Sequence, residues 1–195
     1  SDSLMTNFLG KIVGSVKAAN PDLARKIESA GELAVRVGSL IDGEKTDLSA
    51  DRRRNIALQE IKQSALPLRQ RGLMVLTAVM KPEDAKLLGS FMDPAADSDL
   101  RKTVASGVCT RLTEGEPAKE IRSSLVPVLQ KAVLDSNDFV RQNAVKGLGL
   151  TGMPEAMAPV MACAKDNDEY VRLNVAEALA KFGGERAIAA LVQML

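Results

Sequence analysis

Two stretches near the C-terminus repeat each other, "DNDEYVRLNVAEALAKFGG" at residues 166–184 and "DSNDFVRQNAVKGLGLTG" at residues 135–152. Val171 stands 31 residues after Val140, and the residues around both valines agree at the same offset. Each stretch opens on acidic and amide residues, continues with apolar residues at helical spacing and reaches glycine near its end. A sequence unit of about this length that recurs in tandem is typical of an α-solenoid, in which neighbouring units bury each other's apolar faces.

The repeat extends towards the N-terminus and predicts two helices in each unit. The expected helices span residues 118–134 and 138–149 in one unit, and 154–165 and 169–182 in the next. Gly149 and Gly183 are interpreted as helix stop signals. Weaker copies begin at Leu68-Arg69 and Leu100-Arg101, and an insertion is expected within residues 111–124. The other pairs matched at the 31-residue offset are Arg141 with Arg172, Asn143 with Asn174, Leu148 with Leu179, Ala156 with Ala187, Ala158 with Ala189, Val160 with Leu191 and Met161 with Val192.

The composition agrees with an all-α fold. Apolar residues make up 46% of the 195 residues, but aromatic residues make up only 3% and Trp is absent. A core of Leu, Val, Ile, Ala and Met suits closely packed helices better than a β-sandwich. We therefore expect an all-α solenoid over residues 52–195.

Residues 1–45 do not follow the repeat. One apolar face is predicted in the segment 4–16, and after Pro21 a second helix has apolar residues at heptad spacing. We expect an N-terminal helical hairpin that caps the solenoid, with a dimerisation hairpin as the alternative. The segment 44–54, "EKTDLSADRRR", is interpreted as a charged connector.

The units at residues 135–195 resemble HEAT repeats, in particular the short repeats named after the phycobilisome lyases. The resemblance rests on "DNDEYVRLNVAEALAKFG" and "DSNDFVRQNAVKGLG" as second helices, and on "MPEAMAPVMACAKD" and "ERAIAALVQML" as first helices. It implies a right-handed α-solenoid whose second helices line the concave side. It also implies protein binding as the common use of the fold, while a few members bind DNA or handle bilin chromophores.

Four arginines recur at matched positions, Arg69, Arg101, Arg141 and Arg172. In HEAT families such an arginine pairs with an acidic residue of a neighbouring turn or repeat, and we expect this structural role rather than a phosphate-binding ladder. The basic run "DRRRN" at residues 51–55 is interpreted as a solvated helix start, with contact to an acidic partner as the alternative.

Two rows of residues are expected to face outwards from the second helices and to form the candidate partner-binding surface. The rows mix charged, amide and apolar side chains. DNA binding by a solenoid would require a stripe of Lys and Arg, and the formal net charge of the chain is only +1. We therefore expect no nucleic-acid partner. The two rows are Gln70, Lys102, Gln142 and Leu173, and Met74, Ser106, Lys146 and Glu177.

Catalysis, metals and cofactors find little support in the sequence. The chain has no His, which removes the commonest general base and metal ligand near neutral pH. Cys109 and Cys163 lack CxxC spacing and are expected to be buried apolar residues. Met153, Met157 and Met161 lie four residues apart, and core filling is favoured over an exposed docking stripe. We expect a protein that is not an enzyme and that uses no cofactor.

The sequence thus predicts a cytoplasmic protein-interaction scaffold or adaptor without a membrane span. Two alternatives are a protein that resembles a chromophore lyase or a chaperone and acts on a partner polypeptide, and a nucleic-acid binder. A homodimer through the N-terminal hairpin or the C-terminal end remains open.

The segment "ERAIAALVQML" at residues 185–195 is expected to be a first helix that packs on residues 169–182 through Ile188, Leu191, Val192 and Leu195. Its opposite side, with Ala187, Ala190 and Met194, lacks the charges of a terminal cap. We therefore hypothesise that this end of the solenoid is covered by further chain, by a second copy or by a partner.

Overall fold

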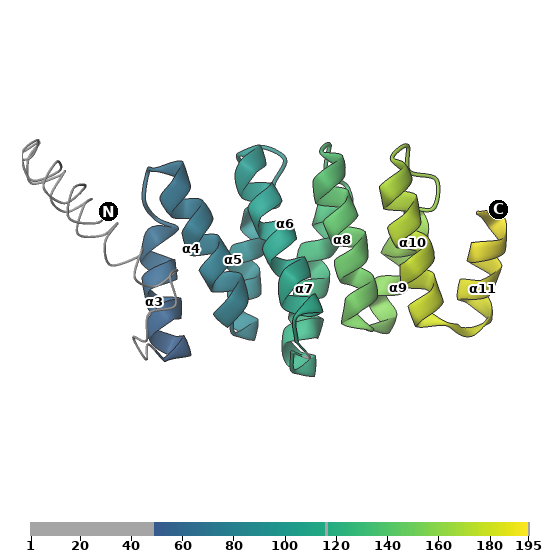
Figure 1. The fold of residues 1–195 in the computed structure, drawn as a ribbon, viewed down its shortest axis with the longest axis horizontal. Coiled ribbons are helices and arrows are strands. Elements are labelled where there is room, and N and C mark those ends of the chain that lie inside the picture. Colours follow the sequence, from purple (N-terminus) through teal and green to yellow (C-terminus); the bar gives the residue numbers. More distant parts are fainter. Residues whose placement is uncertain (1–48, 116, 195) are drawn as a thin grey trace, which may run out of the picture. The chain divides into compact units, whose positions relative to one another are not determined.

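The computed structural model describes residues 49–115 and 117–194, which lie in one compact unit that begins at Ser49. The expected hairpin at residues 1–45 lies outside the described residues. In the described part, helices follow one another as successive antiparallel pairs (Figure 1). Four pairs are complete, and a single further helix follows them. The pairs are α3 (Ala50–Glu60) with α4 (Leu66–Val79), η1 (Pro82–Asp84) and α5 (Ala85–Ser90) with α6 (Ser98–Thr113), α7 (Lys119–Ala132) with α8 (Asp138–Thr151), and η2 (Pro154–Ala156) and α9 (Met157–Ala162) with α10 (Glu169–Phe182), before α11 (Gly184–Gln193).

The second helices of the four pairs form one continuous layer. Helix α4 packs on α6, α6 on α8, and α8 on α10. They stand side by side in Figure 1, while α5 and α9 lie behind them. The helix α5 contacts α7, so the first helices form a second layer. This two-layer stack of helix pairs is the all-α repeat architecture that the sequence predicts.

Acidic and amide residues cap the starts of the second helices α8 and α10. Asn137 accepts a hydrogen bond from the backbone N–H of Val140, and Asp168 accepts one from Val171. A short acceptor at this position satisfies a backbone donor of the first helical turn. Helix α8 ends at Gly152, whose φ of 62° is left-handed, and this conformation is cheap for glycine.

Gly149 is not the stop signal that the sequence suggested, because α8 continues past it to Thr151. Gly149 is buried inside α8 and faces α10. A Cβ at this position would lie 2.6 Å from the Cβ of Ala178. The absence of a side chain therefore permits the close approach of two helices, which explains a glycine within the helix.

The 31-residue register is confirmed by burial. Val140 and Val171 are fully buried, as are Leu148 and Leu179. Ala156 and Ala187, matched in the first helices, are also fully buried. The insertion expected within residues 111–124 falls where α6 ends at Thr113 and α7 begins at Lys119, which is an earlier start than in the next unit.

The chain around residue 50 differs from the expected connector. Helix α3 begins at Ala50, so the run "DRRRN" lies in its first turns, and Ser49 caps it through a hydrogen bond from Arg52 N–H. The first helix of the first unit is therefore built from residues that look like a linker in sequence. Its low apolar content is compensated by α4, against which it packs.

The orientation of α11 differs in part from the expected one. Ala187 and Ala190 are buried, whereas Ile188 and Val192 are 59% and 64% exposed. The small alanine side chains allow α11 to approach α10, with which it is in contact. Ile188 and Val192 consequently face outwards, whereas Leu191 packs against the core as expected. Leu195 lies outside the described residues.

Candidate functional site: the outer face of the second helices

The eight candidate partner-binding residues lie on α4, α6, α8 and α10, two on each helix and one turn apart. None of them is buried. Met74 and Leu173 are 61% and 54% exposed, which is unusual for large apolar side chains. We call this surface the second-helix face. It consists of Gln70, Met74, Lys102, Ser106, Gln142, Lys146, Leu173 and Glu177.

Three of these side chains are held in place by local hydrogen bonds. Lys102 Nζ lies 3.1 Å from Asp99 Oδ1, and the Ser106 hydroxyl donates to the carbonyl of Thr103. Gln142 Nε2 donates to Asp168 Oδ1 at 3.0 Å, and thereby links α8 to the cap of α10. A surface whose side chains are partly fixed loses less conformational entropy when it binds a partner.

A hollow of about 240 Å³ opens between α4 and α6 on this face. Met74 and Ser106 lie on its wall, together with Thr77, Gly107 and Arg111. A Cβ on Gly107 would lie only 2.5 Å from Thr77 Oγ1, so the glycine sets how closely the two helices approach. The sequence predicted Met74 and Ser106 as surface residues, but it gave no signal that they share a hollow.

Two of the four recurrent arginines form the expected ion pairs between units. Arg101 donates to both carboxylate oxygens of Asp135, with Nε 2.6 Å from Oδ2. Arg141 binds Asp166 in the same bidentate way, with both N···O distances 2.9 Å. Because Arg141 donates these hydrogen bonds, the pKa of Asp166 is lowered. These guanidinium groups are therefore structural, as the resemblance implied, and are not a phosphate-binding ladder.

The other two recurrent arginines have different surroundings. The Arg69 guanidinium lies 5.7 Å from the ring centroid of Phe91, which is a cation–π distance. Arg172 donates to the carbonyl oxygens of Asp166 and Asn167 at 2.7 and 3.0 Å. No acidic side chain among residues 49–115 and 117–194 forms a salt bridge with Arg172.

The basic run at residues 51–55 is only partly solvated. Arg52 and Arg53 are exposed, as expected, but Arg54 is largely buried and pairs with Asp84 through N···O distances of 2.6 and 2.5 Å. The Asp84 side chain is only 4% exposed. The structure thus corrects the interpretation of Arg54, which joins the first unit to the second. A contact between residues 30 positions apart leaves no local signal in the sequence.

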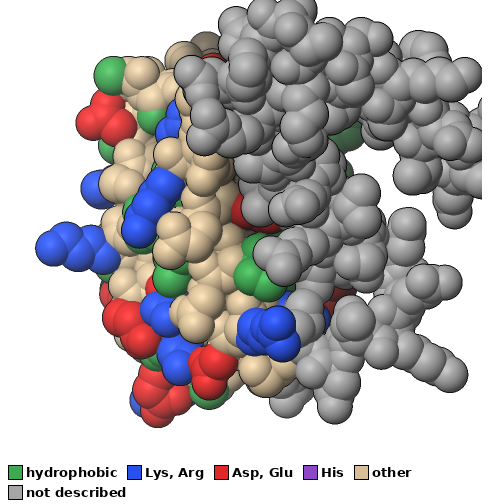
Figure 2. All heavy atoms as spheres, turned by 90° about the vertical axis from the view of Figure 1, so that its left-hand side faces the viewer, with side chains coloured by type: hydrophobic (Ala, Val, Ile, Leu, Met, Phe, Trp, Pro, Cys, Tyr) green, Lys and Arg blue, Asp and Glu red, His purple; other side chains and the backbone are tan. Residues whose placement is uncertain are grey.

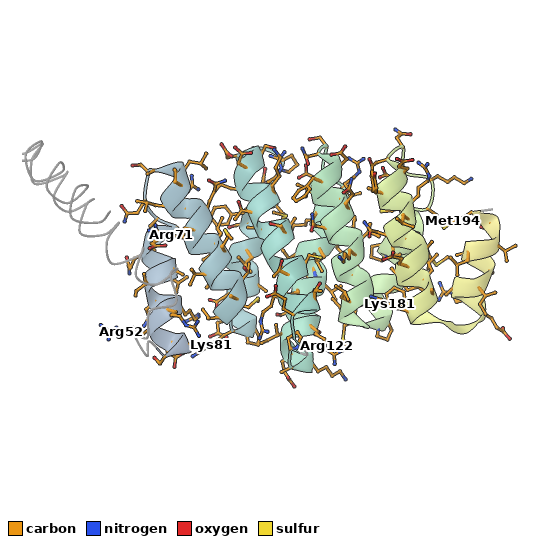
Figure 3. The ribbon with its side chains drawn as sticks, in the orientation of Figure 1. Arg52, Arg71, Lys81, Arg122, Lys181 and Met194 are labelled. Carbon is orange, nitrogen blue, oxygen red and sulfur yellow. The ribbon has the colours of Figure 1, made fainter. Side chains whose placement is uncertain are left out.

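Charges of both signs surround this basic run. Lys81 Nζ lies 2.8 Å from Asp51 Oδ1. Figure 3 labels Arg52, Arg71 and Lys81 at this end of the described chain, and Arg71 pairs with Glu60 at 3.1 Å. Figure 2, which views the α3 end, shows basic and acidic side chains near one another on the visible described surface. No uniform basic field is therefore visible on this part of the surface.

The two thiols are in environments that disfavour nucleophilic chemistry. Cys109 and Cys163 are free and buried, and burial raises the pKa of both. Since the thiolate is the reactive form, neither cysteine is activated. Within the described residues no cluster of His, Cys, Asp and Glu has the arrangement of a metal site. The same residues contain no helix that is long and apolar enough to cross a membrane.

The methionines follow the favoured interpretation. Met153 is 7% exposed, and Met157 and Met161 are partly buried and pack against the core. They fill space between helices and do not form an exposed stripe.

Comparison with known proteins identifies a repeat family in the C-terminal part of the chain. Residues 120–195 match the family model described as HEAT repeats, and the match covers α7 to α11. No curated protein matches the chain. The match, together with the stacking of the earlier second helices α4 and α6 in the same layer, supports a HEAT-like repeat protein.

Proposed function

We propose that this chain is a non-enzymatic scaffold or adaptor that binds a protein partner on the second-helix face. HEAT repeats are commonly protein-interaction scaffolds, and the family match over residues 120–195 supports this class of function. We further propose that the superhelix is right-handed, that this face is its concave side, and that the repeats are of the phycobilisome-lyase type. These finer proposals rest on the sequence resemblance.

The observation that carries the proposal is the contrast between repeated and unrepeated positions. Inward positions keep one chemistry from unit to unit, as with Val140 and Val171, or Leu148 and Leu179. The outward positions of the same helices change from Met74 to Lys146 and Glu177. Packing does not require this variety, because these side chains are exposed. Recognition of these different side chains by a specific partner would account for the variety.

The centre of the proposed contact is the hollow at Met74 and Ser106. An exposed methionine provides a flexible apolar surface that adapts to a partner side chain. Lys102 and Lys146, both at least partly exposed on the neighbouring helices, add positive charges that select an orientation. We therefore expect the partner to present an apolar residue flanked by acidic or polar ones.

A comparison of variants tests the proposal. Met74→Glu and Lys146→Glu are made together and compared with the exposed control Glu155→Lys on η2. Proteins that bind the immobilised wild-type chain in an extract of the native host are quantified by mass spectrometry. We expect at least one specific partner to be depleted about tenfold or more on the double variant and retained on the control, since hot-spot residues contribute about 2 kcal/mol or more. Equal recovery of all partners on the double variant would refute the proposal.

A further inference from the structure

The outward side of the last two helices, α10 and α11, forms an open apolar groove of about 460 Å³. It lies between α10 and α11, which are visible at the C-terminal end of the described unit in Figure 1. Leu173, Ile188 and Val192 are each more than half exposed within it. Its wall also includes Leu191, Met194 and Arg172, and Figure 3 labels Met194 near the end of α11.

In the preceding unit the equivalent surface is covered. Met157 and Met161 stand 31 residues before Ile188 and Val192, and they are packed against the core. The helix α8, which corresponds to α10, is covered by α10 itself. The groove thus has the form of a surface that elsewhere in this chain receives another helix.

Arg172 indicates the charge that a helix bound in the groove should provide. Arg141 donates to the carbonyl oxygens of Asp135 and Ser136, and Arg172 donates to those of Asp166 and Asn167, which are the equivalent positions. Arg141 additionally binds the carboxylate of Asp166, in the loop before the next second helix. Arg101 likewise binds the carboxylate of Asp135, in the loop before α8. The corresponding carboxylate for Arg172 is not provided by the described residues, so an occupant of the groove can provide it.

The close helix crossings indicate which small residue the occupant should have. A Cβ on Gly107 would clash with Thr77, and a Cβ on Gly149 would clash with Ala178. In both crossings one of the two facing residues is glycine. On the outward side of α10, Ala180 stands 31 residues after Gly149 and is exposed. The occupant therefore needs glycine where it crosses Ala180.

We infer that the groove between α10 and α11 binds an amphipathic helix of a partner protein. In the partner, an acidic loop directly precedes this helix. Asp166 defines the pattern, since it precedes the buried Val171 by five residues and Ala178, which crosses Gly149, by twelve. Asp135 precedes Val140 and Gly147 by the same numbers of residues. The occupant therefore has an Asp, an apolar residue five positions after this Asp, and a Gly twelve positions after the same Asp. Asp84, Asp135 and Asp166 are already paired within the chain, so the described part of a second copy does not provide this loop.

This site lies on α10 and α11 and shares only Leu173 with the second-helix face, so it does not rest on the function proposed for that face. The chain itself contains a suitable probe, the peptide of residues 133–151. It has Asp135, Val140 and Gly147 at the required spacing. Short isolated helices are marginal in water, so the peptide is also prepared with a hydrocarbon staple between positions 139 and 143, one turn apart.

In the binding test, each peptide carries a fluorescent label and is titrated with the full chain, and the fluorescence anisotropy of the peptide is measured. We expect one-to-one binding that is tighter for the stapled peptide. Asp135→Asn and Gly147→Ala in the peptide should each weaken binding about tenfold, as expected for loss of a charge pair or of close packing at an interface. In the chain, Arg172→Gln should remove the sensitivity to Asp135→Asn, because the two changes affect one interaction.

Matched surface variants locate the contact. Val192→Lys should abolish binding, whereas Leu134→Lys, at a side chain 84% exposed outside the groove, should leave it unchanged. No binding of the stapled peptide at about 1 mM, a limit that corresponds to about 4 kcal/mol, would overturn the inference. Self-association of the chain that Val192→Lys abolishes would assign the groove to a second copy and would overturn it as well.

Discussion

At the scale of the residue, the fold depends on a few ion pairs that join successive units. Arg101 and Arg141 each bind the carboxylate of the next loop in a bidentate geometry, and these four side chains are all less than one-fifth exposed. Asp135 and Asp166 also accept a backbone N–H within their own loops, from Asn137 and Asp168. One carboxylate thus shapes a loop and fixes the preceding unit against it.

The pair of Arg141 and Asp166 predicts a specific pH dependence of stability. The pKa of Asp166 is lower in the folded chain than the value of about 3.9 of an unfolded aspartate. A lowered folded pKa stabilises the fold above the unfolded pKa, and this contribution is lost as the pH falls through the folded value. We expect Asp166→Asn to lower the free energy of unfolding at pH 7 by about 1–3 kcal/mol, with a smaller difference from wild type near pH 3.

Urea unfolding at the two pH values measures this effect. Asp99→Asn is the control, because Asp99 pairs with Lys102 at the surface, where both side chains are more than one-third exposed. Such a surface pair contributes little, so the control should change stability by less than about 1 kcal/mol. A loss for Asp166→Asn that is equal at pH 7 and pH 3 would contradict the ion-pair explanation.

At the scale of the element, two close crossings between second helices, α4 with α6 and α8 with α10, require a residue without a side chain. Replacing Gly149 by alanine would place a Cβ 2.6 Å from the Cβ of Ala178 and 2.9 Å from its Cα. Alanine is about 1 kcal/mol better than glycine in a helix, but overpacking of a core typically costs about 1–3 kcal/mol. We expect Gly149→Ala to be destabilising, and the added change Ala178→Gly to restore part of the loss.

Thermal unfolding of the single and double variants measures this coupling. Gly89 in α5 provides the control, because a Cβ there would lie an ordinary 3.7 Å from the nearest atom, on Val128. Gly89→Ala should therefore be neutral or stabilising. If Gly149→Ala behaved like Gly89→Ala, the close crossing would not be a constraint on the fold.

The repeated core positions predict equivalent losses in two different units. Leu148 and Leu179 are both fully buried and are matched by the 31-residue repeat. Each Leu→Ala change removes buried methyl groups and leaves a cavity, so we expect a loss of about 2–5 kcal/mol for each. Urea unfolding of the two variants provides the measurement. A loss below about 1 kcal/mol for either leucine would show that its surroundings collapse around the change.

The sequence was informative wherever periodicity alone decides the structure. It predicted the register of Val140 and Val171, and the placement of the eight outward residues on second helices. The sequence-based predictions failed at positions whose structure is determined by packing between segments far apart in the chain. The sequence alone suggests a helix end at Gly149 and a solvated side chain at Arg54. Only the structure shows that Ala178 packs against Gly149 and that Asp84 pairs with Arg54.

Helix α11 shows the same limit for a helix that has two apolar sides. Hydrophobicity favours Ile188 and Val192 as the buried side. The structure buries Ala187 and Ala190, because close approach to α10 requires small side chains. The groove that results from this choice, and the hollow beside Gly107, could not be derived from the order of residues alone.

At the scale of the whole molecule, the distribution of charge argues against nucleic acid as a partner. The formal net charge is +1, from 26 basic and 25 acidic residues. Four guanidinium groups of the described units are paired with carboxylates. A phosphate backbone would therefore meet isolated lysines beside acidic and apolar residues on the second-helix face. The ion pairs between units engage Arg54, Arg101 and Arg141, and Arg71 pairs with Glu60 inside the first helix pair.

We expect no binding to duplex DNA tighter than about 10 µM at about 0.15 M salt, since non-specific binders with free basic surfaces fall between about 0.1 mM and 1 µM. Fluorescence anisotropy with a labelled duplex measures this at several salt concentrations. A variant with Met74→Lys, Leu173→Lys and Glu177→Lys is the positive control, because it joins Lys102 and Lys146 in a basic stripe. That variant should gain binding that weakens steeply with salt, while submicromolar, salt-dependent binding by the wild-type chain would contradict the expectation.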